Sequence, residues 1–170
     1  MRDEVRIEPW SEGDLTLLRL MNAPELMDHL GGPETEDQLL VRHEQYVGMS
    51  AGTSGAGTMF RVVTTATGQA VGTIGYWERT RQGEVIYESG WGVLTEHQGR
   101  GLAGAALEAV LERAALERRH RFLHAFPSVG NGPSNAVCRK AGFSLLGECD
   151  FEYPPGRPMR CNDWRVELTF

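Results

Sequence analysis

The chain has few cysteines, and they are not arranged in pairs. Cys138, Cys149 and Cys161 are an odd number, and no two of them form a C-x-x-C motif. Disulfide scaffolds carry dense, even sets of cysteines, and structural zinc sites use closely spaced pairs. The pattern therefore argues against a disulfide framework and against a zinc site, and it predicts three thiols. The histidines form no ligand pattern either, so we expect no metal.

Long apolar runs and an excess of positive charge are also missing. No run approaches the roughly 18 residues of a membrane span, and the start Met1-Arg2-Asp3-Glu4 lacks the apolar segment of a signal peptide. With 17 Lys and Arg against 23 Asp and Glu, the net charge is −6. Such a field repels nucleic acid and mildly favours cationic partners such as amines. We expect a cytoplasmic protein that binds neither membranes nor nucleic acid.

The composition is that of one folded domain. The chain has 170 residues, of which 41% are hydrophobic and 24% charged, and it is long enough to bury most of its apolar surface. It contains no internal repeat and no low-complexity tract. We therefore expect residues 1–170 to form a single domain.

Hydrophobic periodicity predicts a mixture of strands and helices, which places the fold in the α/β class, of the α+β type. Strands are expected over Val5–Trp10, Thr58–Thr65, Ala70–Arg79, Glu84–Leu94, Phe122–Phe126, Phe143–Tyr153 and Asn162–Phe170. Helices are expected around Leu15–Met21, from Glu36 to about Met49, from Leu102 to at least Ala114, and over Ser134–Ala141. The proline-rich segment 154–158 is expected to be a loop between the last two strands.

The most informative stretch is VLTEHQGRGLAG, residues 93–104, where a strand-like run meets a glycine-rich turn that opens into an amphipathic helix. The first N–H groups of a helix lack partners and carry about half a positive charge. Gly99 and Gly101 have no Cβ to hold a ligand away from those groups, and Arg100 can add a charged contact. The turn therefore predicts a phosphate cradle, which we define as Gln98–Ala103.

Three phosphate-binding motifs compete for this turn. A P-loop needs Lys and then Ser or Thr after its last glycine, but Gly104 is followed by two alanines. Gly99, Gly101 and Gly104 spell G-x-G-x-x-G, yet a dinucleotide site also needs an acid about 20 residues further on. That position falls near residues 120–124, which contain no Asp or Glu. The third motif is the Gln-x-x-Gly-x-Ala loop that binds coenzyme A, and the turn matches it at every defined position.

This loop and a second motif resemble the GNAT acyltransferase superfamily. Gln98, Gly101 and Ala103 match the first signature, and NGPSNAVCRKAGF, residues 131–143, is similar to the second. The spacing, and the strand segment ESGW that begins at Glu88, look most like the branch of ribosomal-protein N-terminal acetyltransferases. The resemblance spans roughly residues 5–170, although only 84–146 are specific.

The resemblance implies a fold, a reaction and a cofactor site. The fold is a mixed, mostly antiparallel central sheet of six to seven strands flanked by about four helices. The reaction moves acetyl from acetyl-CoA to a primary amine, either a protein N-terminus or a small molecule, and a homodimer is left open. The residues implied to bind the cofactor are Val93, Leu94, Gln98, Gly99, Arg100, Gly101, Leu102, Ala103, Asn131 and Ser134.

Within that set, the residues have different implied roles. Val93 and Leu94 act through backbone N–H groups that hold the pantetheine arm and the thioester carbonyl. Asn131 binds the pantetheine arm. Ser134 either contacts the cofactor or only caps the helix that follows it.

Two residues are candidates for proton transfer. Glu88 lies on the strand that leads to the cradle, eleven residues before Gly99, and burial would fit it to act as a general base. Cys138 stands seven residues after Asn131, where many relatives carry a tyrosine acid. A substrate-orienting acid and a packed thiol are the alternatives for these two side chains. A protein that binds acyl-CoA only as a sensor is the alternative for the whole chain.

Overall fold

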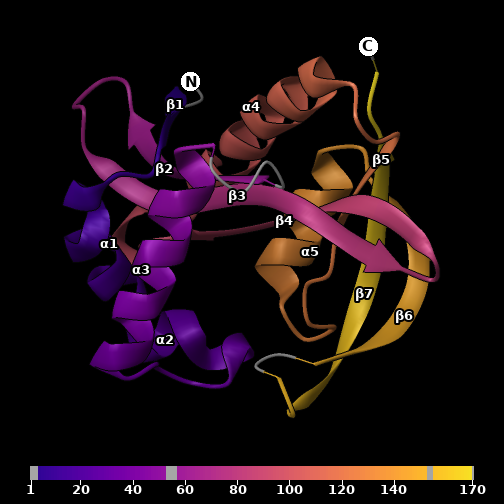
Figure 1. The fold of residues 1–170 in the computed structure, drawn as a ribbon, viewed down its shortest axis with the longest axis horizontal. Helices are drawn as coiled ribbons and strands as arrows, with labels where there is room; N and C mark the ends of the chain where they lie inside the picture. Colours follow the sequence, from indigo (N-terminus) through magenta and orange to yellow (C-terminus); the bar gives the residue numbers. More distant parts are fainter. Residues whose placement is uncertain (1–3, 53–56, 153–154, 170) are drawn as a thin grey trace.

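The computed structural model describes residues 4–52, 57–152 and 155–169 (Figure 1). Its strands are β1 (Val5–Pro9), β2 (Gly57–Thr64), β3 (Ala70–Arg81), β4 (Glu84–Val93), β5 (Phe122–Ala125), β6 (Ser144–Glu152) and β7 (Pro158–Glu167). Its α-helices are α1 (Leu15–Met21), α2 (Pro24–Met27), α3 (Glu36–Ser50), α4 (Leu102–Glu117) and α5 (Gly132–Lys140).

The strands form one sheet in the order β1-β2-β3-β4-β5-β7-β6. Neighbouring strands run antiparallel except β4 and β5, which are parallel. Parallel neighbours need a crossover connection, and α4 supplies it. The predicted mixed, mostly antiparallel sheet is confirmed with seven strands. Five α-helices are present among the described residues where about four were expected, because the four-residue α2 is too short to give a periodic pattern.

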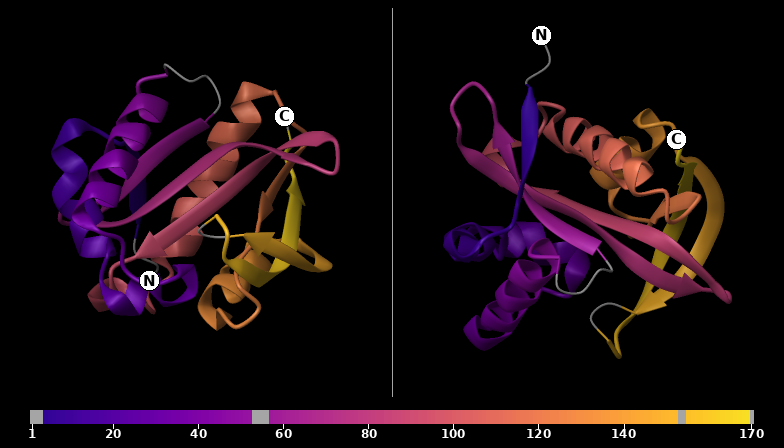
Figure 2. Two further views of the ribbon diagram at one scale, coloured as in Figure 1. Left: turned by 60° about the horizontal axis from the view of Figure 1, so that its bottom comes forward. Right: turned by 45° about the horizontal axis from the view of Figure 1, so that its top comes forward.

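The helices cover both faces of the sheet. Figures 1 and 2 show α1, α2 and α3 on one face, and α4 and α5 on the other. The larger core lies under α4, whose predicted apolar positions Leu102, Ala106, Val110 and Ala114 are all buried. A smaller core lies beneath α1 and α3 around Trp10. Helices therefore pack against both faces of the sheet, and this packing holds the ends of the strands in place.

Several predicted boundaries are shifted, and two elements begin at least two residues earlier than predicted. Strand β7 begins at Pro158, where Glu152 of β6 pairs with it, and not at Asn162. Proline fits the first position of a strand because no ladder hydrogen bond is needed from it there, so the last residue of the predicted loop already belongs to β7. Residue 154 of that loop and residue 153, the predicted end of the preceding strand, lie outside the described residues. Helix α5 begins at Gly132 rather than Ser134.

Two tyrosines of the sheet share one carboxylate of α4, and this contact predicts a stability effect. The hydroxyls of Tyr76 and Tyr87 each donate to a different oxygen of Glu117, both at 2.5 Å. Glu117→Ala leaves two phenols in the core without this acceptor, so we expect a loss of about 1–3 kcal/mol in the free energy of unfolding. Urea denaturation measures it, with the exposed Glu112→Ala on the same helix as the control. Equal stability of the two variants would contradict the assignment.

Candidate functional site

Strands β4 and β5 separate soon after they meet. Among the described residues they pair only at Tyr87 with Leu123 and at Glu88 with His124, although β4 continues to Val93. Strand β5 instead pairs along its length with β7 on its other side. We call residues 89–93 the open edge of β4, because no described strand lies beside them on the β5 side, and we call the Glu88–His124 position the apex.

Alternate N–H groups of β4 point toward its open edge. The N–H of Leu94 donates to the Val71 carbonyl at 2.8 Å, and so points toward β3. Because hydrogen-bonded and non-hydrogen-bonded positions alternate along an antiparallel pair, Trp91 and Val93 direct their N–H groups away from β3. Val93 therefore fits its predicted backbone role. The prediction for the N–H of Leu94 is wrong, because that group already bonds within the sheet.

The phosphate cradle has the geometry of an anion site. Gly99 and Gly101 have φ angles of +78° and +76°, in the left-handed region that favours glycine. Gly101 precedes α4 without capping it through a side chain, so the first N–H groups of this 16-residue helix face outward. Leu102 is only 2% exposed, so it and Ala103 can contribute through backbone N–H groups. The cradle thus fits a pyrophosphate.

Side chains of the same turn brace it and add positive charge. Gln98 Nε2 donates to the Val93 carbonyl at 3.0 Å, which ties the turn to the end of the open edge. Arg100 Nη1 lies 3.0 Å from His97 Nδ1. The other ring nitrogen of His97 is buried without a hydrogen-bond partner in the part of the chain that the structure describes. A ligand at this turn therefore lies beside the Arg100 guanidinium, whereas the unsatisfied nitrogen of His97 is buried behind it.

Asn131, not Ser134, caps α5. The side-chain oxygen of Asn131 accepts a hydrogen bond from the Ser134 N–H at 3.2 Å. Ser134 is the third residue of the helix, so the capping alternative for it is wrong, and contact with the cofactor stays a prediction. Pro133 explains the earlier start, because proline is tolerated in the first helical turn. The amide nitrogen of Asn131 and the second lone pair of its oxygen remain for the predicted contact with the pantetheine arm.

Glu88 lies at the apex and is largely buried. It is 9% exposed, and Arg79 Nη1 of β3 donates to its Oε1 at 2.8 Å. Burial raises the pKa of Glu88 above its ordinary value, and the Arg79 guanidinium opposes part of that rise. A buried carboxylate with a raised pKa has the property that a general base needs near neutral pH.

Strand alternation places Glu88 on the α1–α3 face of the sheet. A Cβ built on Gly90 would lie 3.1 Å from the ring of Trp77, which packs against the core beneath α1 and α3. Tyr87 points the other way, toward α4. Glu88 therefore shares its face with Gly90, as expected for residues two apart on a strand.

Cys138 is packed in the core beneath α4 and α5. It is 0% exposed, and burial raises the pKa of its thiol to about 12. Proton transfer from such a thiol to a departing thiolate of ordinary basicity, whose pKa is about 8.5, runs uphill. This environment favours the packing alternative over the predicted acid role.

Sequence reasoning did not identify the other polar groups at the apex. His124 of β5 and Asp163 of β7 are both buried and hydrogen bonded to each other, and Arg81 of β3 pairs with Asp163. Burial of His124 was readable from its place in an apolar strand. Its partner lies 39 residues away, and only the sheet order brings the two together.

A small cavity adjoins the open edge on the α1–α3 face. Its volume is about 110 Å³, and Thr73, Trp91 and Gly92 contribute to its walls from the sheet. Leucine and methionine side chains of the helices make up much of the remainder. A two-pronged ion pair also lines it, in which Arg42 Nε and Nη2 donate to the two oxygens of Glu34 at 2.7 and 2.9 Å. The cavity is thus mainly apolar with one charged corner.

Other kinds of site are not found in the described part of the chain. Over residues 4–52, 57–152 and 155–169, no helix is long and apolar enough to cross a membrane. The same residues include no group of three or more His, Cys, Asp or Glu side chains placed to hold a metal ion. Cys138, Cys149 and Cys161 are free thiols.

Comparison with protein families gives a match over most of the chain. The model of the acetyltransferase (GNAT) domain matches residues 4–144. A sequence comparison with curated proteins finds no match.

Solved structures with the same fold include acetyltransferases that act on different amines. One, from Salmonella typhimurium, modifies the N-terminal serine of ribosomal protein L7/L12, with a TM-score of 0.80, 18% identity, and 98% of this chain and 96% of that chain covered. A RimL L7/L12 acetyltransferase in complex with coenzyme A has a TM-score of 0.79 and 16% identity, with 97% of this chain and 94% of that chain covered. Spermidine N-acetyltransferase from Vibrio cholerae, in complex with CoA and spermine, has a TM-score of 0.77 and 18% identity, with 97% of this chain and 96% of that chain covered. At these identities the likeness is one of fold.

Proposed function

Because the chain belongs to the GNAT acetyltransferase family, we propose that it is an N-acetyltransferase that moves acetyl from acetyl-CoA to a primary amine. The observation that carries the proposal is the open edge of β4, which runs from a buried glutamate at the apex to a glycine-rich helix start. The whole chain, residues 1–170, acts as one such domain.

The cofactor lies along the open edge. Its pyrophosphate meets the N–H groups at the start of α4, and its pantetheine arm runs back along β4 beside the N–H groups of Val93 and Trp91. With about 3.3 Å per strand residue, the path from Leu94 to Glu88 is roughly 20 Å long. An extended arm along this path brings the thioester to the apex.

Glu88 accepts the amine proton at the apex. As the nitrogen bonds to the acetyl carbon, its N–H bond breaks and an O–H bond forms on Glu88, while the C–S bond to the carrier breaks. Arg79 donates to Oε1 of the carboxylate, and a side-chain hydrogen bond from Trp77 also stabilises its charged form. The raised pKa of Glu88 brings its basicity closer to that needed near neutral pH.

The acceptor enters from the α1–α3 face. The cavity beside Thr73 and Gly92 lies on this face, and the side chain of Glu88 projects from the same face without lining the cavity. Relatives of the same fold act on a ribosomal-protein N-terminus and on spermidine, so we propose a peptide N-terminus or a small amine as the acceptor class.

The proposal is tested by acetyl-CoA-dependent thiol release with N-terminal peptides, polyamines, aminoglycosides and amino acids. Release with one class establishes the enzyme and its acceptor. CoA binding without release for any amine would instead support the alternative of an acyl-CoA sensor, which the burial of Cys138 at the acid position favours. Absence of CoA binding would reject both functions.

A further inference from the structure

His124 and Asp163 form a buried pair at the apex. His124 Nδ1 lies 2.7 Å from Asp163 Oδ1, and each residue is 5% exposed. Because a carboxylate can only accept, Nδ1 carries the proton, and Nε2 is the basic nitrogen of the neutral ring. The second oxygen of Asp163 lies 3.1 Å from Arg81 Nη2. Asp163 is therefore held from two sides, and it fixes both the tautomer and the orientation of the imidazole.

The basic nitrogen of His124 is not the one that bonds to Asp163. Its ring is hydrogen bonded through Nδ1, and no bond to Nε2 is found among the described residues. Of all their fully buried side-chain nitrogen and oxygen atoms, only His97 Nε2 lacks a partner. His124 Nε2 is not one of these atoms, and the residue as a whole is 5% exposed.

Glu88 is the immediate neighbour of His124. The two residues are register partners at the last paired position of the parallel strands, so their side chains leave the same face from backbones about 4.8 Å apart. The ring of His124 stacks on Phe126 with centroids 5.7 Å apart, which limits its rotation. Around them, Arg79 pairs with Glu88, and Arg81 pairs with Asp163.

We propose that His124, oriented by Asp163, relays the proton that Glu88 takes from the acceptor amine. The O–H bond on Glu88 breaks, an N–H bond forms at Nε2, and the negative charge of Asp163 balances the resulting imidazolium. The imidazolium then passes its proton to water at Nε2. Arg79 holds Oε1 of Glu88, and this route returns the side chain to the carboxylate for the next turnover. The inference rests on the proposed function.

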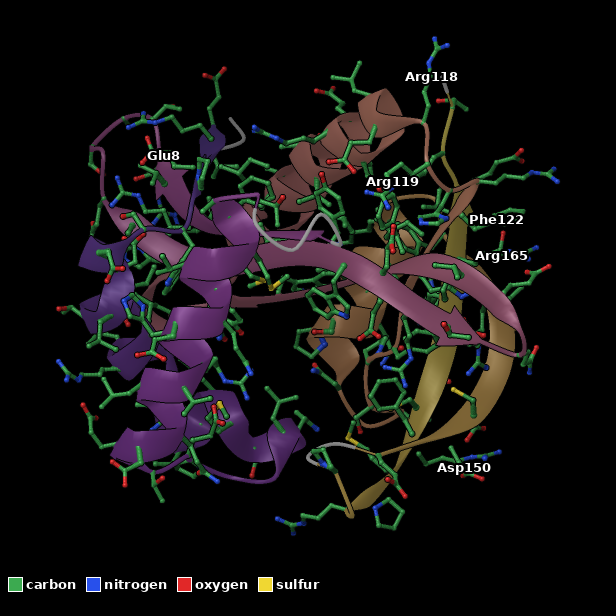
Figure 3. The ribbon with its side chains drawn as sticks, in the orientation of Figure 1. Glu8, Arg118, Arg119, Phe122, Asp150 and Arg165 are labelled. Carbon is green, nitrogen blue, oxygen red and sulfur yellow. The ribbon has the colours of Figure 1, made fainter. Side chains whose placement is uncertain are left out.

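A second histidine–carboxylate pair on the opposite face provides the control. His120 Nε2 lies 3.0 Å from Glu78 Oε1, and Arg119 pairs with the same oxygen at 2.7 Å. His120 packs against the ring of Tyr87 on the α4 side of the sheet, and Figure 3 labels Arg119 just beyond the end of α4. This pair has the same chemistry as the apex pair, but it lies away from the open edge.

The test compares His124→Ala, His124→Asn and His120→Ala by steady-state kinetics, with and without added imidazole. His124→Asn keeps an N–H donor for Asp163 but removes the basic nitrogen. We expect both His124 variants to lower kcat at least about 10-fold, within the range of acid–base groups, with KM for acetyl-CoA nearly unchanged. Imidazole should restore His124→Ala several-fold and should leave Glu88→Gln and His120→Ala unchanged.

Each outcome decides the relay. Unchanged kcat in His124→Asn with an active wild type would overturn it and leave the proposed function intact. Lost activity in His124→Ala without rescue, together with unchanged kcat in His124→Asn, would assign His124 to packing and also overturn the relay. A wild type that releases no thiol with any amine would overturn the relay and the proposed function together.

Discussion

Gly101→Asp is expected to lower the affinity for CoA by about 10²–10³-fold, since a unit charge repelled at about 4 Å near a protein surface costs a few kcal/mol. The new carboxylate would lie at the start of α4, where it would both repel the pyrophosphate and occupy the N–H groups that the cradle offers. The fold should survive, because aspartate tolerates the left-handed conformation better than most residues do. Isothermal titration with CoA measures the change.

Gly101→Asn separates charge from shape in that experiment. Asparagine has nearly the same size as aspartate and tolerates the same backbone angles, but it carries no charge. We expect the Asn variant to lose much less affinity than the Asp variant. Equal losses would mean that steric contact and not repulsion decides, and wild-type affinity in Gly101→Asp would reject the cradle as the phosphate site.

Much of the fold follows from local patterns. The spacing of Leu102, Ala106 and Val110 predicts helix α4, and all three residues are buried as that spacing requires. The hairpin of β2 and β3 is signalled by alternation on both sides of Gly68, which has a φ of +70°. Errors occur where one residue type has two uses. Proline signals a loop, yet Pro158 also fits the first position of a strand.

The residues of the candidate site likewise fall into those that local sequence patterns reveal and those that they do not. The phosphate cradle is contiguous in sequence, so its glycines and the helix behind them are readable together. The partners of Glu88 and His124 cannot be read from the sequence in this way. Arg79 and Asp163 come from other strands, and the pairing of strands in the sheet brings them to Glu88 and His124. The Leu94 error has a similar origin, since an N–H group points to β3 or to the open edge according to a register that alternation alone does not define.

Glu88→Gln is expected to lower kcat by about 10²–10⁴-fold, the usual contribution of a general base, with the affinity for acetyl-CoA nearly unchanged. The amide keeps the shape of the side chain and an oxygen for Arg79, but it cannot accept the amine proton. Turnover and acetyl-CoA affinity are measured separately, by steady-state kinetics and by titration calorimetry. Full activity in the variant would remove Glu88 from the mechanism.

The pH profile of kcat tests whether the ionisation of Glu88 controls turnover. Because burial raises the pKa of Glu88, a base at this position loses activity as pH falls through a value above the ordinary glutamate pKa of about 4.3. That acidic limb should stay in place when acceptor amines of different pKa are compared, and it should vanish in Glu88→Gln. Glu78→Gln is the matched control, because Glu78 also pairs with an arginine and lies beside a histidine, but on the α4 face. A limb that follows the amine, or that disappears equally in the Glu78 variant, would assign the titration to the acceptor or to the fold and not to the carboxylate at the apex.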